Sequence, residues 1–284
     1  GVCLITTKNS AAGKTQVTYE FKYTIQSLGK TPKVMNGEQD VTYRDESGAI
    51  PGIKWDGTNT DWLKETFESA PMQKHNLSIS GGNDKSTYLM SLSYLDQEGI
   101  VKGKDDNYKR YSGMFNGSQI VNKWLKVGSS IQINRTSRKA MNENDESRGV
   151  ISNAILLDPL TPAEYTGTLP THVQEMVDAG RKLMQSEDGN YYGISRYVNG
   201  ETINPLVQKR QNQTTTTVTS MMGTAYADLT PFEGLAITSK LGINYYAKTA
   251  HNYKPEYYYS GEMLNAFASV GESDDTMTYW QWEN

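Results

Sequence analysis

The sequence QVTYEFKYTIQ at residues 16–26 alternates apolar and polar side chains without an exception. Because successive side chains of a strand point to opposite faces, the odd-numbered residues from Val17 to Ile25 form an apolar face and the even-numbered residues form a polar one. A globular strand usually has about 5 or 6 residues, whereas a strand that crosses a bilayer at a tilt needs roughly 9 to 11. The run therefore predicts a strand of membrane length.

Similar alternating runs follow along the chain. They lie at residues 76–81, 86–96, 110–120, 125–135, 217–229 and 235–246, and a last one begins at Thr276. Tight turns at 82–85, 121–124 and 230–234 alternate with long connections at 27–75, 97–109, 136–216 and 247–275. Short periplasmic turns and long extracellular loops are typical of outer-membrane barrels. The chain is therefore predicted to be all-β, a transmembrane antiparallel β-barrel segment of about eight strands.

Charge is segregated between the two phases of these strands. The phase expected to face lipid contains no charged residue. Its members are Tyr88, Met90, Leu92, Tyr94, Tyr111, Gly113, Phe115, Gly117, Leu125, Val127, Ser129, Ile131, Ile133, Leu235, Ile237, Ser239, Leu241, Ile243 and Tyr245. The other phase carries Glu20, Lys22, Arg110, Lys126, Gln132, Asn134 and Lys240. Lys or Arg on the lipid face costs about 2 to 4 kcal/mol at the midplane, so this segregation is expected there. A soluble sheet with one buried face would alternate in the same way, and the run 217–229 does not reveal its phase.

Composition excludes several classes of protein. The 284 residues are 36% hydrophobic and 21% charged with a net charge of −4, and no stretch of about 18 apolar residues occurs, which excludes a helical membrane protein. Basic residues are scattered singly, so no nucleic-acid partner is indicated. The lone Cys3 excludes an internal disulfide. Nineteen tyrosines against five phenylalanines favour a membrane interface, although they also suit a sugar-binding surface.

Two long connections contain helix signals. Thr171 followed by Gln174 resembles a capping box that opens a helix over residues 171–185. The apolar face of this helix would consist of Val173, Met176, Val177, Gly180 and Met184. Asp61 could cap a shorter helix that presents Leu63 and Phe67 and ends before Pro71.

Few residues suggest chemistry. Gly13-Lys14-Thr15 lacks the earlier glycine of a phosphate-binding loop, and His75, His172 and His251 have no metal-ligand spacing. We expect no cofactor, no metal and no catalytic site. A glycosidase needs two carboxylates about 5 to 10 Å apart on a rigid frame, whereas the candidates Asp56, Asp61 and Glu65 lie together in one long loop. The loop aromatics are the candidates for contact with substrate or with a partner protein, or for packing within their own loops: Trp55, Trp62, Tyr191, Tyr192, Tyr257, Tyr258 and Tyr259.

Several strings resemble one family. GVCLITTK at residues 1–8 is similar to the last plug strand of the SusC/RagA family of TonB-dependent outer-membrane transporters. TDW at 60–62, APMQ at 70–73 and HNLSISGG at 75–82 are similar to the first long loop and second strand of that family. KSTY at 85–88 and YLDQEGIV at 94–101 complete the resemblance, which is looser after Arg135. Cys3 and residues 9–13 depart from the usual pattern without disturbing the strands.

The resemblance implies a barrel of about 22 strands closed by an N-terminal plug. It also implies a SusD-like surface lipoprotein that captures glycan or peptide, and energy supplied through TonB. Residues 1–15 would then be the end of the plug domain and a hinge, and residues 16–284 the N-terminal part of the barrel in the bacterial outer membrane. TonB would act through a region that lies outside this chain. The alternatives are a soluble all-β carbohydrate-binding module or glycosidase, and a purely structural barrel or adhesin.

Overall fold

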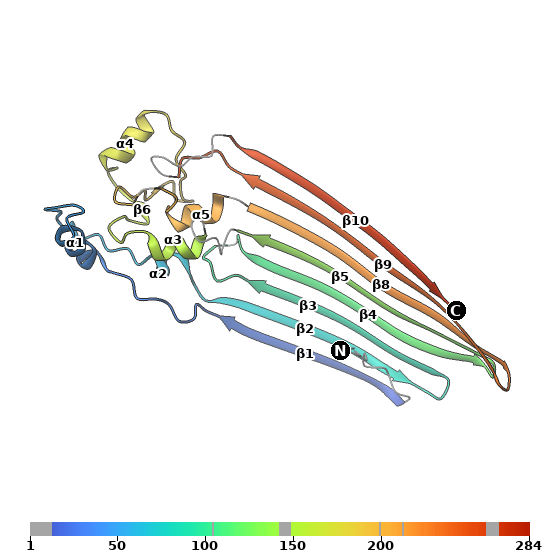
Figure 1. The fold of residues 1–284 in the computed structure, drawn as a ribbon. Coiled ribbons are helices and arrows are strands. Elements are labelled where there is room, and N and C mark those ends of the chain that lie inside the picture. Colours follow the sequence, from blue (N-terminus) through green and yellow to red (C-terminus); the bar gives the residue numbers. More distant parts are fainter. Residues whose placement is uncertain (1–12, 104, 142–148, 199, 212, 260–266) are drawn as a thin grey trace.

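The computed structural model describes residues 13–103, 105–141, 149–198, 200–211, 213–259 and 267–284 and contains one eight-stranded antiparallel sheet (Figure 1). Its strands are β1 (Gly13–Gln26), β2 (Ala70–Gly82), β3 (Ser86–Glu98), β4 (Asn107–Asn122), β5 (Leu125–Ala140), β8 (Gln213–Phe232), β9 (Leu235–Lys254) and β10 (Ser269–Glu283). Each strand pairs with the next main strand in the chain. The predicted all-β fold is confirmed.

The strands extend beyond the alternating runs that predicted them. β8 and β9 have 20 residues each, and β10 begins at Ser269 rather than Thr276. β1 begins at Gly13, with an irregular register between Gly13 and Gln16. Ladder hydrogen bonds need only the backbone, so polar segments such as the threonines at the start of β8 can pair without alternating.

The two ends of the sheet differ, as the connection lengths predicted. The helices and long connections gather at one end, and the short turns lie at the other (Figure 1). In the turn between β2 and β3, the carboxamide oxygen of Asn83 accepts hydrogen bonds from the backbone N–H groups of Lys85 and Ser86, each 2.8 Å long. We call these ends the long-loop end and the short-turn end.

The register places all the predicted lipid-facing residues on a single face. In one row across the sheet, His75 pairs with Tyr94, Tyr94 with Tyr111, and Tyr111 with Arg135. The next row toward the short-turn end joins Leu77, Leu92, Gly113 and Ile133. Directly paired residues share a face. We call the face with Phe21 the outward face and the face with Lys22 the inner face.

The phase of β8 follows from the same register. Ile133 pairs with Met221, and Met221 pairs with Tyr245, so Met221 lies on the outward face. Met222 pairs with Gln132 on β5 and with Asn244 on β9, so Met222 lies on the inner face. The two neighbouring methionines, which the sequence could not distinguish, therefore face different environments.

Polar side chains on the inner face are linked to one another across strands. The hydroxyl of Ser93 donates to the carboxamide oxygen of Asn76 at 2.6 Å, and the Asn76 amide donates to Glu20 at 3.2 Å. Farther along, Ser130 donates to Asn116 at 2.5 Å. These ladders of neutral and charged hydrogen bonds suit a wet face and confirm which phase is polar.

The long connections carry their own helices and a small two-stranded sheet. These elements are α1 (Gly37–Glu46), α2 (Trp62–Thr66), α3 (Val150–Leu156), α4 (Thr171–Asp178) and α5 (Pro205–Gln211), with β6 (Glu164–Tyr165) paired to β7 (Tyr191–Tyr192). The three hydrophobic clusters of the described residues lie in these connections. On the sheet itself, Phe21 remains 52% exposed and Trp280 68% exposed. In the part of the chain that the structure describes, no helix has the length and apolarity to cross a membrane.

The two predicted helices have different outcomes. Asp61 caps α2 as predicted, since its side chain accepts a hydrogen bond from the backbone N–H of Lys64. The prediction for α4 was wrong in two respects: Pro170 occupies the N-cap position, with no side-chain cap, and the helix ends at Asp178 rather than at residue 185. Gly180 adopts a φ of +72°, and the N–H of Arg181 returns to the carbonyl of Met176, a Schellman motif that terminates the helix.

Candidate functional site at the long-loop end

Trp62, a predicted contact residue, lies in the interior of the loop assembly. Its ring is only 3% exposed and belongs to a cluster with Phe67, Val101 and Val150. The indole N–H donates to the backbone carbonyl of Asp158 at 2.7 Å. A substrate or partner cannot reach this ring in the observed conformation, so its assignment as a contact residue is corrected to a packing role.

Tyr192 and Tyr259 are corrected in the same way. Both are buried in a second cluster with Met184, Ile203 and Val207. Long connections that are ordered must bury apolar side chains of their own, because the sheet offers them no core. The aromatic composition of these loops therefore reflects packing as well as surface chemistry.

Four predicted aromatics keep surface area. Trp55 is 45% exposed, and its indole N–H donates to the carbonyl of Thr58 at 2.8 Å. Tyr191 and Tyr258 pack from the edge onto a third cluster around Val173, and Tyr257 packs against the second cluster. These four residues remain the candidates for contact with a substrate or partner.

A polar pocket of about 310 Å³ opens among the loops near Trp55. It is lined in part by Asp56, Tyr165, His172, Arg196 and Tyr197. The guanidinium of Arg196 lies 4.8 Å from the centre of the Tyr197 ring and donates to the Tyr197 hydroxyl at 2.6 Å. A cation, a carboxylate and several hydroxyl groups lining one hollow suit a hydrogen-bonding ligand.

Local hydrogen bonds and burial set the ionisation of this pocket. The backbone N–H of Thr58 donates to Asp56 and lowers the pKa of that carboxyl, and the Arg196 charge acts in the same direction. Burial raises the pKa of Tyr165. His172 Nε2 lies 3.0 Å from the backbone carbonyl of Ile194, which fixes its ring. At neutral pH the pocket therefore presents an anionic Asp56 opposite a cationic Arg196.

Contacts between distant loops hold the pocket in place, and sequence patterns did not indicate them. The buried Asp158 accepts hydrogen bonds from Thr161 and from Ser195, which joins two parts of the long 141–212 connection. Arg44 of α1 forms a 2.6 Å ion pair with Asp40 and donates to the carbonyl of Tyr197 at 3.3 Å. The capping box of α1, Asn36 with Gln39, was a usable sequence signal for that helix.

The loop carboxylates that were considered for glycoside hydrolysis have local structural partners. Asp61 caps α2, and Asp56 accepts the N–H of Thr58. Glu65 lies 3.9 Å from Lys102. Within the described residues, no group of three or more His, Cys, Asp or Glu side chains is placed to hold a metal ion.

The phosphate-loop pattern at Gly13-Lys14-Thr15 lies within β1, so no helix follows it. A phosphate-binding loop needs a helix N-terminus at that point. Residues 1–12, which carry most of the resemblance to a plug strand, lie outside the described residues.

Comparison with known proteins identifies relatives of one kind. The TonB-dependent receptor P26 of Formosa agariphila is 26% identical over 282 residues, which is 94% of this chain and 25% of the relative. The TonB-dependent receptor SusC of Bacteroides thetaiotaomicron is 29% identical over 167 residues, 57% of this chain and 16% of SusC. The resemblance to the SusC/RagA family is confirmed. No family model matches the chain.

The solved structures agree on the fold of this SusC/RagA-like chain. It superposes on the RagAB peptide transporter with a TM-score of 0.70 at 18% identity, over 97% of this chain and 33% of the other. The 'open-open' state of the RagAB peptide importer gives a TM-score of 0.67 over 97% of this chain. The chain spans about a quarter of the length of P26.

Proposed function

We propose that this chain forms the first wall strands of an outer-membrane transporter that imports glycan or peptide nutrients with energy delivered through TonB. The observation that carries the proposal is the separation of the two sheet faces by the register. The outward face carries the apolar residues from Val17 on β1 to Trp280 on β10 with a polar row near the long-loop end, and the inner face carries hydrogen-bonded polar ladders such as Ser93–Asn76–Glu20. A membrane-spanning wall around a wet lumen requires this separation.

The exposure of the outward face supports a lipid environment. Phe21, Leu92, Leu241 and Trp280 are each more than half exposed, and no second layer covers them within the described residues. A soluble carbohydrate-binding sheet would bury one such face against a core. The alternative of a soluble module or glycosidase is therefore less favoured than a membrane wall.

The loop assembly is the proposed site of partner and substrate contact. In the proposed orientation it is extracellular, and the short turns are periplasmic. A SusD-like lipoprotein would dock on the exposed loop surface that includes Trp55 and Tyr257. The polar pocket with Asp56 and Arg196 offers both hydrogen-bond acceptors and hydrogen-bond donors to a sugar or to a peptide backbone. The similarity to the RagAB peptide transporter supports a peptide, and the family resemblance of the sequence leaves a glycan equally open.

Deletion of the complete gene followed by whole-cell uptake of labelled oligosaccharides and peptides tests this proposal. Uptake of at least one substrate class should fall, and the gene supplied in trans should restore it. Dissipation of the proton gradient should stop uptake in the complemented strain. Unchanged uptake of all glycans and peptides in the deletion strain would contradict the proposal. Recovery of the folded chain from the soluble fraction without detergent would favour the carbohydrate-binding alternative.

A further inference from the structure

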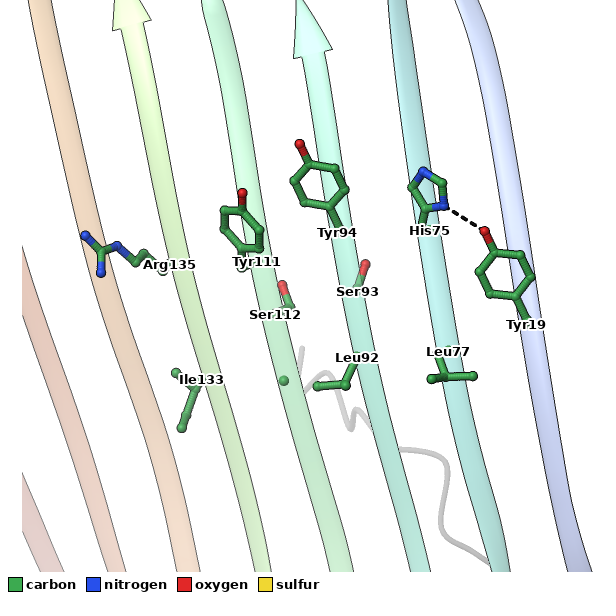
Figure 2. A pocket seen from close by; sticks show the side chains of 11 residues that line it. Tyr19, His75, Leu77, Leu92, Ser93, Tyr94, Tyr111, Ser112, Ile133 and Arg135 are labelled. Atoms are coloured by element: carbon green, nitrogen blue, oxygen red, sulfur yellow. Dashed lines mark hydrogen bonds between the residues drawn. The ribbon is translucent and has the colours of Figure 1, made fainter.

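A groove of about 530 Å³ crosses the outward face of the sheet between β1 and β5. Figure 2 shows two bands of side chains along it. The band nearer the long-loop end holds the polar tips of Tyr19, His75, Tyr94, Tyr111 and Arg135, and the second band holds Leu77, Leu92 and Ile133. The groove is therefore polar at one end and aliphatic at the other.

Gly113 opens the aliphatic end of the groove. It stands in the register row between Leu92 and Ile133, where its neighbours carry branched side chains. A Cβ built on Gly113 would lie 3.7 Å from Leu92 Cδ2, an ordinary van der Waals contact. Glycine is thus not required by the backbone there, and its effect is to leave a furrow between the side chains of Leu92 and Ile133.

Aromatic contacts keep the polar end in shape. The Tyr19 hydroxyl lies 2.7 Å from His75 Nδ1, and the ring centres of Tyr94 and Tyr111 are 4.9 Å apart. The His75 ring stacks on Tyr94 with centres 6.1 Å apart. Aromatic side chains that combine an apolar ring with a polar group, such as tyrosine, are enriched at the membrane–water interface.

Arg135 supplies an unmatched positive charge at this level. Within the described residues the side chain of Arg135 has no ion pair or hydrogen bond, whereas the side chain of Lys109, one row nearer the long-loop end, pairs with Asp96 at 3.3 Å. Asp96 also accepts the Tyr94 hydroxyl at 2.8 Å. Because Lys109 and Asp96 balance each other, the charge of Arg135 leaves this end of the groove positive. An anion from outside the chain could neutralise it.

The depth of Arg135 agrees with a headgroup position. On β5 the outward residues from Leu125 to Ile133 are uncharged, and Arg135 follows them. Ten residues at about 3.3 Å each, inclined by about 40°, span roughly 25 Å, the usual height of the apolar band. Arg135 thus lies at the edge of that band, where a guanidinium can bind phosphate oxygens in a bidentate fashion.

We propose that this groove is a specific site for one membrane lipid with an anionic phosphate headgroup. The phosphate binds Arg135 and the hydroxyl group of Tyr111, its register partner, and one acyl chain lies along Gly113 between Leu92 and Ile133. The inference rests on the proposed membrane placement of the outward face. It adds a lipid that stays bound at this position while the bulk bilayer exchanges around the rest of the wall.

Native mass spectrometry of the complete gene product in detergent tests the site. The protein is titrated with lipid A, the phosphorylated lipid of the extracellular leaflet, and, separately, with the same lipid A after its phosphates have been removed. The wild type should bind the first lipid several-fold more tightly. Arg135→Gln should weaken that binding about tenfold, because one charge-assisted bidentate contact is lost. Gly113→Leu should weaken binding of both lipids, because the leucine fills the furrow.

Arg138→Gln is the matched control, since Arg138 lies on the same strand but on the inner face. It should bind both lipids as the wild type does. Equal binding of the two lipids by the wild type, or equal loss in Arg135→Gln and Arg138→Gln, would overturn the site. Displacement of the lipid by millimolar inorganic phosphate alone would assign the anion to free phosphate instead. Every variant should first show heat-modifiable migration, so failure of membrane assembly, which concerns the proposed function, is separated from failure of lipid binding.

Discussion

The indole N–H of Trp62 and the backbone carbonyl of Asp158 are joined by a 2.7 Å hydrogen bond across 96 positions of sequence. One partner belongs to the connection between β1 and β2, and the other to the connection between β5 and β8. The adjacent backbone pair, Thr60 N–H to the carbonyl of Pro159 at 2.9 Å, strengthens the same junction. Two loops from distant strands therefore share one core.

Trp62→Ala should loosen this shared core. Loss of a buried aromatic ring leaves a cavity and an unpaired carbonyl, and destabilises the surrounding structure by about 3 to 5 kcal/mol. Faster amide hydrogen exchange in α2 and α3 should report the change. Trp55→Ala, at a residue that is 45% exposed, is the control and should leave exchange in α3 unchanged. Equal effects of the two substitutions would refute the packing role of Trp62.

The face assignment of β1 predicts unequal effects of two neighbouring substitutions. Phe21→Lys in the complete protein should impair membrane assembly, because a lysine on the lipid face costs about 2 to 4 kcal/mol at the midplane. Lys22→Phe, on the inner face, should assemble much better. Heat-modifiable migration in gels measures the folded fraction. Similar folded fractions for both variants would defeat the assignment.

The register of β8 makes a sharper test, because both residues start as methionine. Met221→Lys places a charge on the outward face, and Met222→Lys places it on the inner face. Only the first should reduce the folded fraction in the membrane, by an amount that corresponds to about 2 to 4 kcal/mol. If Met222→Lys were the more damaging variant, the register between β5 and β8 would be shifted by one residue.

Lys209 should make the stability of the loop assembly depend on pH at the alkaline end. The side chain is 6% exposed, donates to the carbonyl of Lys102, and has its pKa lowered below 10.5 mainly by burial. The folded state therefore loses this proton at a lower pH than the unfolded state. As pH rises from the folded-state pKa toward 10.5, stability should rise, and below that window it should be constant.

Limited proteolysis of the loops at matched protease activity measures this dependence. Lys209→Met should remove the rise, because no titrating group remains at that position. Lys182→Met is the control, since Lys182 is exposed and paired with Glu256 at 2.8 Å. A rise that persists in Lys209→Met would assign the dependence to another group.

The sheet was predictable from sequence because the same alternation of apolar and polar residues recurs in strand after strand. Alternation at every second position from Val17 to Ile25 reflects a physical requirement of a two-sided wall, and the same requirement acts on each later strand. The phase of β8 was not predictable, because methionine and small residues suit either face and only the cross-strand partners decide. Arg135 is the first outward charge beyond Ile133 on β5, and its significance depends on partners that only the register shows.

The loop site was predictable in composition but not in arrangement. The aromatic residues of these connections were recognisable as candidates for contact or for packing, yet nothing local distinguishes Trp55 from Trp62. Burial of Trp62 depends on Val150 and Asp158, which lie far away in sequence. The end of α4 was open to prediction from a glycine at the C′ position, but Gly180 and Met184 were counted on the apolar face and the prediction ran on to residue 185.

The ties between loops limit how the loop assembly can move relative to the sheet. Arg44 and Trp62 fasten the first connection to the third, Lys209 fastens the third to the second, and Lys182 fastens the third to the fourth. A loop assembly joined in this way should move as one rigid body about the ends of the strands, and its four connections should not move independently. Force applied by a docked partner to any one loop would then be shared by all of them.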